Sequence, residues 1–302
     1  MISNNTIPIF FAADVNYYQH LCVLIVSILE RNQNERFLFN VMTDREDDEA
    51  EKIKSLADKY PNFDIRFMVM NDSMFEGLPL PLEHITLQMY YRLLIPLLVP
   101  ELEKALYLDS DMVCNIGLRE LWTTPIDGYY VAGVPDNLGW DTRRYLCQSV
   151  FPQRTEYINS GMLLMNLSMI RNENKIPELF AWLQSHPETK YPDQDAVNSV
   201  FLQKIKIIDT KWNNTTGCQR KLRKSIAHFI TEKKPWRADR YCPHHCASLY
   251  FRYLKLTPYR NYIIKWRKES WKIRMAGRVK ECIKFPERFV RNYIVKPLKK
   301  TA

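Results

Sequence analysis

Three short apolar runs alternate with two helical segments at the start of the chain, and this alternation constrains the fold more than any other feature. The runs cover residues 7–13, 37–42 and 63–69, and the helical segments between them cover residues 20–29 and 47–59. Strands that alternate with helices form a mostly parallel sheet with right-handed crossovers. The sequence therefore predicts an α/β fold whose ligands bind at the carboxyl ends of the strands.

The chain continues with the same kinds of segment. We expect helices over residues 85–98, 176–183 and 196–202, and strands over residues 129–135, 162–167 and 204–209. A further apolar run, Leu106-Tyr107-Leu108, ends in Asp109-Ser110-Asp111.

The acidic pair is the strongest local signal of chemistry. In a strand, Asp109 and Asp111 would point to the same face, about 7 Å apart, or less if the chain turns there. Such carboxylates repel one another unless a cation lies between them, and Mg²⁺ or Mn²⁺ fits this arrangement. The alternative is a strand end with solvated or helix-capping aspartates.

Charge is distributed unevenly along the 302 residues. Residues 250–302 contain 16 Lys or Arg and 3 Asp or Glu, whereas the rest contains 27 and 31, so the net charge of +9 comes from the tail. Basic residues interleaved with aromatic ones favour an anionic membrane surface. The alternatives are a solvated basic helix packed on the body, and RNA.

Cysteine usage and the absence of export signals favour the cytoplasm. The seven cysteines are scattered and odd in number, which does not predict a disulfide framework. Cys242-Pro-His-His-Cys246 resembles half of a zinc site, but a second pair at ligand spacing is missing. We find no signal peptide and no apolar stretch near the ~20 residues that a membrane span needs.

Polar clusters stand at the ends of predicted strands or the starts of helices, and each alone could be a cap, a turn or a surface charge. In order along the chain they are Asp14-Val15-Asn16, Arg92, Asp109-Ser110-Asp111, Asp136, Asn159-Ser160-Gly161, Asp193-Gln194-Asp195, and His228 with Lys234. Together they resemble glycosyltransferase family 8, the retaining enzymes of the GT-A fold.

Six segments carry this resemblance, which runs from residue 7 to about residue 236. They are residues 11–17, 89–93, 106–111, 157–166, 191–198 and 228–236. The fifth matches the family's D-Q-D-x-[LIV]-N pattern and the sixth its H-[FY]-x-G-x-x-K-P-W pattern. One departure is Thr231, where the family usually has Gly, so the resemblance implies that a main-chain amide near the diphosphate is presented differently here.

The resemblance implies a role for each cluster. It assigns Mn²⁺, with Mg²⁺ as the alternative, to Asp109, Asp111 and His228, and the UDP diphosphate to that metal and Lys234. The uridine is assigned to Ala12, Asp14 and Asn16, with Asp109 and Ser110 near the ribose. The sugar and the chemistry at its anomeric carbon are assigned to Arg92, Asn159, Ser160 and the catalytic candidates Asp136, Asp193 and Gln194.

The mechanism implied by the resemblance has two versions. A double displacement needs a nucleophile on the far face of the anomeric carbon, and the residue matching that place is Gln194, a poor nucleophile. We therefore expect same-face attack, in which Gln194 stabilises oxocarbenium character. Asp193 and Asp195 are the alternative nucleophiles.

We accordingly expect a manganese-dependent, retaining hexosyltransferase, with a GT-A domain over residues 1–248 and a membrane-associating tail over residues 249–302. It would move galactose or glucose from a UDP-sugar to lipopolysaccharide core or another lipid-linked saccharide, at the inner face of a bacterial cytoplasmic membrane. The alternatives are a capsule-directed, protein-directed or self-glucosylating transferase of the same family, and a metal-dependent nucleotidyltransferase. We do not expect nucleic acid as a partner.

Overall fold

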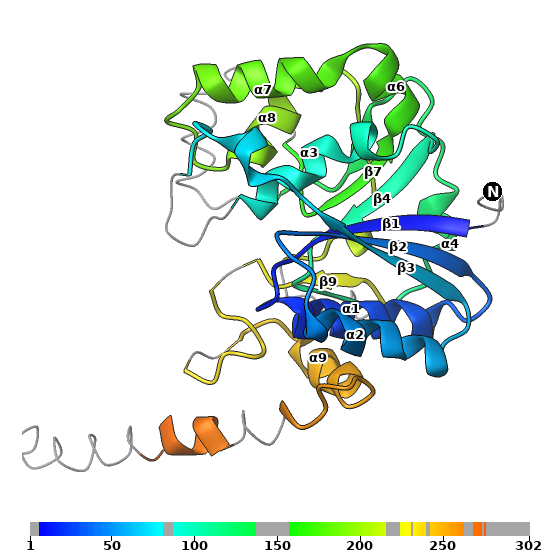
Figure 1. The fold of residues 1–302 in the computed structure, drawn as a ribbon, viewed down its shortest axis with the longest axis vertical. Coiled ribbons are helices and arrows are strands. Elements are labelled where there is room, and N and C mark those ends of the chain that lie inside the picture. The colour runs from blue at the N-terminus through cyan, green and yellow to red at the C-terminus, as the bar shows by residue number, and fades with distance from the viewer. Residues whose placement is uncertain are drawn as a thin grey trace, which may run out of the picture.

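The computed structural model describes residues 6–80, 87–136, 157–215, 224–230, 232–239, 242–262, 268–273 and 275. A seven-stranded sheet crosses the middle of the molecule in the order β3-β2-β1-β4-β7-β6-β8 (Figure 1). Its strands are β1 (Thr6–Ala12), β2 (Arg36–Thr43), β3 (Phe63–Val69), β4 (Lys104–Leu108), β6 (Val131–Gly133), β7 (Met162–Asn166) and β8 (Ile205–Ile207). Only β7 runs antiparallel to its neighbours, so the predicted mostly parallel sheet is confirmed.

Helices cover both faces of this sheet (Figure 1). The first face carries α1 (Tyr18–Arg31) and α2 (Asp48–Lys54), with α9 (Ala247–Leu254) packed outside α1. The second face carries α3 (Gln88–Leu98), α6 (Leu167–Asn172), α7 (Lys175–Ser185) and α8 (Pro192–Val200). The shorter elements are α4 (Arg119–Trp122) and the 3-10 helices η1 (Ser55–Asp58), η2 (Asp72–Phe75) and η4 (Thr210–Trp212).

A two-stranded antiparallel sheet lies beside the main one and connects distant parts of the chain. It pairs β5 (Met112–Cys114) with β9 (Ile226–His228), and Met112 lies opposite His228. Because Met112 follows Asp111 directly, this register brings the acidic pair beside the histidine.

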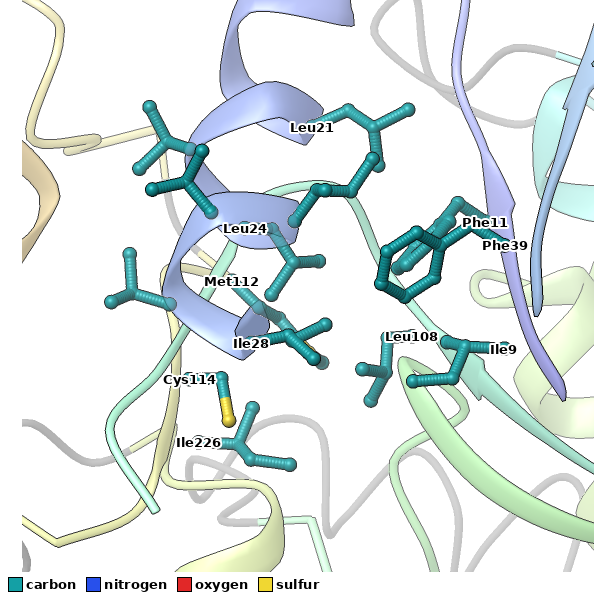
Figure 2. Packing of buried hydrophobic residues seen from close by; sticks show 14 of the residues in the cluster. Ile9, Phe11, Leu21, Leu24, Ile28, Phe39, Leu108, Met112, Cys114 and Ile226 are labelled. Carbon is teal, nitrogen blue, oxygen red and sulfur yellow. The ribbon is translucent and has the colours of Figure 1, made fainter. Parts of the chain in front are cut away.

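The turn between β4 and β5 is fixed by apolar residues on both sides of it. Leu108 and Met112 are fully buried with Leu24 and Ile28 of α1 (Figure 2). Burial of each such side chain stabilises the fold by about 1.5–3 kcal/mol. The buried side chains on either side of residues 109–111 therefore fix the position of the acidic turn.

Two local predictions need refinement. Asp109 and Asp111 do not share one strand, because the strand ends at Leu108 and residues 109–111 form a turn. Helix α8 begins at Pro192, which is suited to a first helical position. Asp193, Gln194 and Asp195 therefore lie in its first turn, and not ahead of the helix.

The start of the predicted tail packs on the body. In α9, Leu249, Tyr250, Tyr253 and Leu254 are buried in the same core cluster as β1 and α1. Where the membrane-associating part begins remains a prediction, since most of residues 263–302 lies outside the described residues. Among the described residues, the helices are too short or too polar to cross a bilayer.

Candidate active site

Three ligand-type side chains meet where the acidic turn faces β9. His228 Nε2 lies 3.0 Å from Asp111 Oδ1 and 3.6 Å from Asp109 Oδ2. One ligand atom from each of these residues lies within 4.8 Å of the other two. The structure thus brings together the three predicted metal ligands from two distant strand ends.

A chain of hydrogen bonds sets the orientation of His228. The main-chain N–H of Gly161 donates to Asn159 Oδ1, which also accepts from Asn213 Nδ2 at 2.8 Å. Asn213 Oδ1 therefore faces His228 Nδ1, at 2.9 Å, and Nδ1 must carry the proton of that bond. In the neutral ring, the lone pair of Nε2 then points toward the two aspartates, as a metal-binding histidine requires.

The carboxylate oxygens fit a divalent cation between these groups. Asp109 Oδ1 accepts from Arg92 Nη2 at 2.9 Å and from Tyr107 OH at 2.7 Å, which leaves Oδ2 on the side of His228. Asp111 Oδ1 is buried and has no hydrogen-bond partner among the described residues. Two carboxylate oxygens and one imidazole nitrogen form a ligand set of intermediate softness that suits Mn²⁺.

Gly161 makes room for this site. A side-chain Cβ at this position would lie 2.6 Å from Asp109 Oδ2 and even closer to His228 Cε1. The carbonyl of Gly161 also accepts the main-chain N–H of Asp109 at 2.8 Å. The residue must therefore be small, because the main chain passes directly against two metal-ligand candidates.

Lys234 extends the site toward a negatively charged ligand. Its Nζ donates to Asp111 Oδ2 at 2.5 Å and also to the carbonyl of Phe229. Burial alone would raise the pKa of Asp111, but the ammonium group of Lys234 lowers it well below the usual range. Asp111 is therefore ionised, and a positive charge stands next to the predicted metal.

A buried arginine links the metal turn to the first turn of α8. Arg92 of α3 is 6% exposed and donates through Nη1 to the carbonyl of Ser160 at 2.7 Å. Its Nε forms an ion pair with Asp193 Oδ2 at 3.2 Å, and that oxygen accepts a hydrogen bond from Ser160 Oγ at 2.8 Å. Because Arg92 also bonds Asp109, these residues form one connected polar network.

The side chain of Gln194 is held in a defined orientation. Its Oε1 accepts from the main-chain N–H of Ser160 and from Asn159 Nδ2, both at 3.0 Å. Its Nε2 donates to Asp136 Oδ2 at 2.9 Å, which also accepts from Asn159. The main-chain donor fixes which end of the amide is the oxygen, so Gln194 presents its NH₂ group to Asp136.

Asp195 differs from its neighbours because it is fully enclosed. Tyr157 OH donates to Oδ1 at 2.5 Å, and Oδ2 accepts from Thr189 Oγ1 and from the main chain of Tyr191. Burial raises the pKa of this carboxyl group. These bonds give Asp195 a structural role under α8.

The residues predicted to hold the nucleoside lie at the carboxyl end of β1. Ser110 Oγ donates to the carbonyl of Ala12 at 2.9 Å, which joins the end of β1 to the acidic turn. Asn16 Nδ2 donates to Asp14 Oδ2, and Asp14 Oδ1 accepts from the N–H of Tyr17, just before α1. Asp14 therefore also supports the start of the helix.

Sequence reasoning missed Asn213 and Tyr107, although each contacts a predicted ligand. Asn213 is 2% exposed and follows η4, far along the chain from Asn159. Tyr107 falls within an apolar strand, and that pattern predicts a core residue. Thr231, the departure from the family pattern, lies outside the described residues.

His244 has a structural role that explains its position. Ligand atoms of His244, His245 and Cys246 come within 4.8 Å of one another. However, His244 Nε2 donates to the carbonyl of Asn214 at 3.0 Å, and Nδ1 accepts from the N–H of Cys246 at 3.2 Å. One ring nitrogen of His244 therefore bonds the main chain at Asn214 and the other the main chain just before α9, so we propose no zinc site there.

Comparison with known proteins identifies this arrangement. The sequence profile of glycosyl transferase family 8 matches residues 8–240, most of the chain. The chain belongs to glycosyltransferase family 8. The family 8 chain is 31% identical over 215 residues to lipopolysaccharide 1,2-glucosyltransferase of Escherichia coli. The aligned region covers 69% of this chain and 62% of that protein.

Solved structures confirm the GT-A fold of this family 8 chain. The galactosyltransferase LgtC, in complex with donor and acceptor sugar analogues, superimposes with a TM-score of 0.69 at 23% identity, over 83% of this chain and 96% of that one. The bifunctional glycosyltransferase WbbM gives a TM-score of 0.71 at 22% identity, over 90% of this chain and only 52% of the longer WbbM chain. These similarities concern the fold alone.

Proposed function

We propose that this protein is a manganese-dependent, retaining glycosyltransferase that moves galactose or glucose from a UDP-sugar to a saccharide acceptor. The observation that carries the proposal is the position of His228 Nε2 against Asp109 and Asp111, with Lys234 alongside. This arrangement offers a divalent cation three ligands and a diphosphate one additional positive charge. The connected side chains of Arg92, Asp136, Asn159, Asp193 and Gln194 would recognise sugar hydroxyls.

The charges of the side chains indicate which groups would bind the diphosphate and which the sugar. A divalent cation bound to Asp109, Asp111 and His228 would supply Lewis-acid stabilisation of the leaving diphosphate. Lys234 adds an ammonium group that offsets the same charge. Arg92 and Asp193 are held by each other and by Ser160, so they can offer pre-oriented polar groups to the sugar.

For retention we favour attack on the same face as the leaving group. Both carboxylate oxygens of Asp195 already accept hydrogen bonds, from Tyr157 and Thr189, which argues against Asp195 as a nucleophile and supports this choice among the alternatives. Asp193 is already paired with Arg92 and Ser160, and it would act as a hydroxyl ligand. A covalent sugar trapped on Asp193 during turnover would contradict this mechanism.

The decisive experiment measures UDP release from UDP-Glc, UDP-Gal, UDP-GlcNAc and UDP-GalNAc with Mn²⁺ or with EDTA. We expect metal-dependent release from UDP-Glc or UDP-Gal. Asp111→Asn should abolish it while the circular dichroism spectrum stays unchanged, because the asparagine preserves shape but removes the charge. Release that is absent from all four donors would reject the donor assignment.

The acceptor and the location are proposed on separate grounds. The likeness to a lipopolysaccharide glucosyltransferase supports a lipid-linked saccharide acceptor, and the basic tail supports peripheral attachment to the inner face of the cytoplasmic membrane. Because Tyr250 and Tyr253 belong to the core, the truncation that tests the tail should remove only residues 263–302. We expect the shortened protein to lose co-sedimentation with anionic liposomes and to keep UDP release. Unchanged sedimentation would reject the membrane role.

A further inference from the structure

Trp236 follows Lys234 by two residues, and aromatic side chains from separate elements enclose it. Its ring stacks on His20 of α1, with centroids 3.9 Å apart and planes at 20°. Tyr17 and Phe229 meet it edge-on, and Tyr250 of α9 lies 5.0 Å from it. Trp236 is 9% exposed, so the position of its ring is set by these neighbours.

The orientation of His20 is set in turn by α9. His20 Nδ1 lies 2.7 Å from the hydroxyl of Tyr250, and both side chains are buried. Burial lowers the pKa of His20 to about 3, so the ring is neutral at any ordinary assay pH. Because the His20 ring is neutral, it can stack on the Trp236 indole without burying a charge. The hydrogen bond to Tyr250 prevents the His20 ring from rotating within the stack.

Trp236 lies within the turn that carries the phosphate-site lysine. The N–H of Arg237 donates to the carbonyl of Lys234 at 3.2 Å and closes this turn. Tyr262 OH, from the segment after α9, donates to the carbonyl of Trp236 at 3.3 Å. Lys234 Nζ lies 5.9 Å from the centre of the Trp236 ring and 2.5 Å from Asp111 Oδ2. Movement of the Trp236 ring would therefore move the main chain that aims Lys234.

We propose that His20 and Tyr250 are positioning residues for diphosphate binding: through Trp236 they hold the 234–237 turn so that Lys234 stays directed at the metal-binding turn. This inference rests on the proposed UDP-sugar function. In this proposal α9, the first helix of the basic tail, also helps to position Lys234 at the donor site. The expected signature is a selective loss of affinity for the diphosphate, with the nucleoside unaffected.

Helix α9 offers a matched control for this test. Tyr253 is also buried, and its hydroxyl also makes hydrogen bonds, to Arg31 Nε at 2.9 Å and Asn115 Oδ1 at 3.1 Å. Tyr250→Phe and Tyr253→Phe therefore each remove one bonded hydroxyl from the same helix and keep the ring. Of these two tyrosines, Tyr250 is the one bonded to His20.

The experiment measures binding of UDP and of uridine to the full-length protein by calorimetry with saturating Mn²⁺. We expect Tyr250→Phe to weaken UDP binding about fivefold and uridine binding less than twofold, and Tyr253→Phe to change neither. His20→Phe keeps a stacking ring but loses the bond, and it should reproduce the UDP-selective loss. The double variant should be no weaker than the worse single variant, because both act through one bond.

The binding data distinguish failure of the proposed function from failure of the positioning role. Wild-type protein that does not bind UDP with Mn²⁺ would reject the proposed function itself. Wild-type binding with equal UDP losses in Tyr250→Phe and Tyr253→Phe would overturn only the positioning role, as would an equal loss of UDP and uridine in Tyr250→Phe.

Discussion

Lys234 Nζ lies 2.5 Å from Asp111 Oδ2, so one predicted metal ligand is bonded directly to the lysine expected at the diphosphate. The side chains of both residues are nearly buried, at 13% and 14% exposure. A buried carboxylate without a compensating charge is strongly unfavourable. Lys234 therefore stabilises the acidic turn as well as the charge of a bound ligand.

The first prediction concerns Lys234→Met, which removes the charge and keeps most of the apolar stem. Asp111 would then depend on a metal ion for neutralisation. We expect a lower melting temperature in EDTA, and a larger increase on addition of Mn²⁺ than in the wild type. Differential scanning calorimetry with and without Mn²⁺ measures both effects.

The control for this prediction is Lys233→Met, since Lys233 is the exposed neighbour. It removes the same charge from the same segment and should leave the Mn²⁺-induced increase as in the wild type. An identical increase in Lys234→Met and the wild type would show that Lys234 does not compensate Asp111.

The second prediction concerns Asn213→Leu. Without Asn213 Oδ1, His228 loses the partner that keeps the proton on Nδ1 and the lone pair on Nε2. Loss of such a partner typically weakens metal binding about 10–100-fold. Calorimetric titration with Mn²⁺ should show this loss, and Asn213→Asp, which can still accept from Nδ1, should lose less. Equal losses in the two variants would contradict the orienting role.

The sequence could predict where the polar clusters stand but not every contact between them. Asp14, Asp109 and Asp136 follow apolar runs, and the carboxyl ends of parallel strands meet at one edge of a sheet. The bond from Asn213 to Asn159 joins residues 54 positions apart, and no local pattern encodes it. The antiparallel direction of β7 was equally invisible, because alternation of apolar residues does not distinguish strand direction.

The first residues of the predicted tail have an apolar spacing that matches their packing in the structure. Leu249, Tyr250, Tyr253 and Leu254 follow the spacing of one apolar helical face. The basic charge of residues 250–302 places this apolar face in the predicted tail, whereas the structure packs it on the body. The net charge of a long segment therefore does not predict whether one helix within it packs on the core.

The third prediction concerns Gly161→Ala. The added methyl group would overlap Asp109 Oδ2 and His228 Cε1, so either the predicted metal ligands or the main chain must shift. We expect at least about a tenfold loss of Mn²⁺ affinity, in line with other disturbances of ligand placement. Gly117→Ala is the control, because the nearest atom to its Cβ would be 3.8 Å away. Wild-type Mn²⁺ affinity in Gly161→Ala would mean that the metal binds elsewhere.

The fourth prediction concerns the pH dependence of stability. Burial lowers the pKa of His20 to about 3, against 6.5 for the free side chain. Below pH 6.5 the unfolded chain binds a proton at this histidine and the folded protein does not, so the stability from neutral His20 is present above pH 6.5 and is lost as the pH falls toward 3.

Between pH 7 and pH 5 this loss amounts to about 2 kcal/mol. In His20→Phe, the decrease in the free energy of unfolding between these two pH values should be smaller by about that amount. Urea unfolding followed by circular dichroism at both values gives the comparison. Because it concerns the change with pH, any constant packing defect in the variant cancels. An equal decrease in both proteins would mean that His20 is charged in the fold, and the flat stack on Trp236 would then need another explanation.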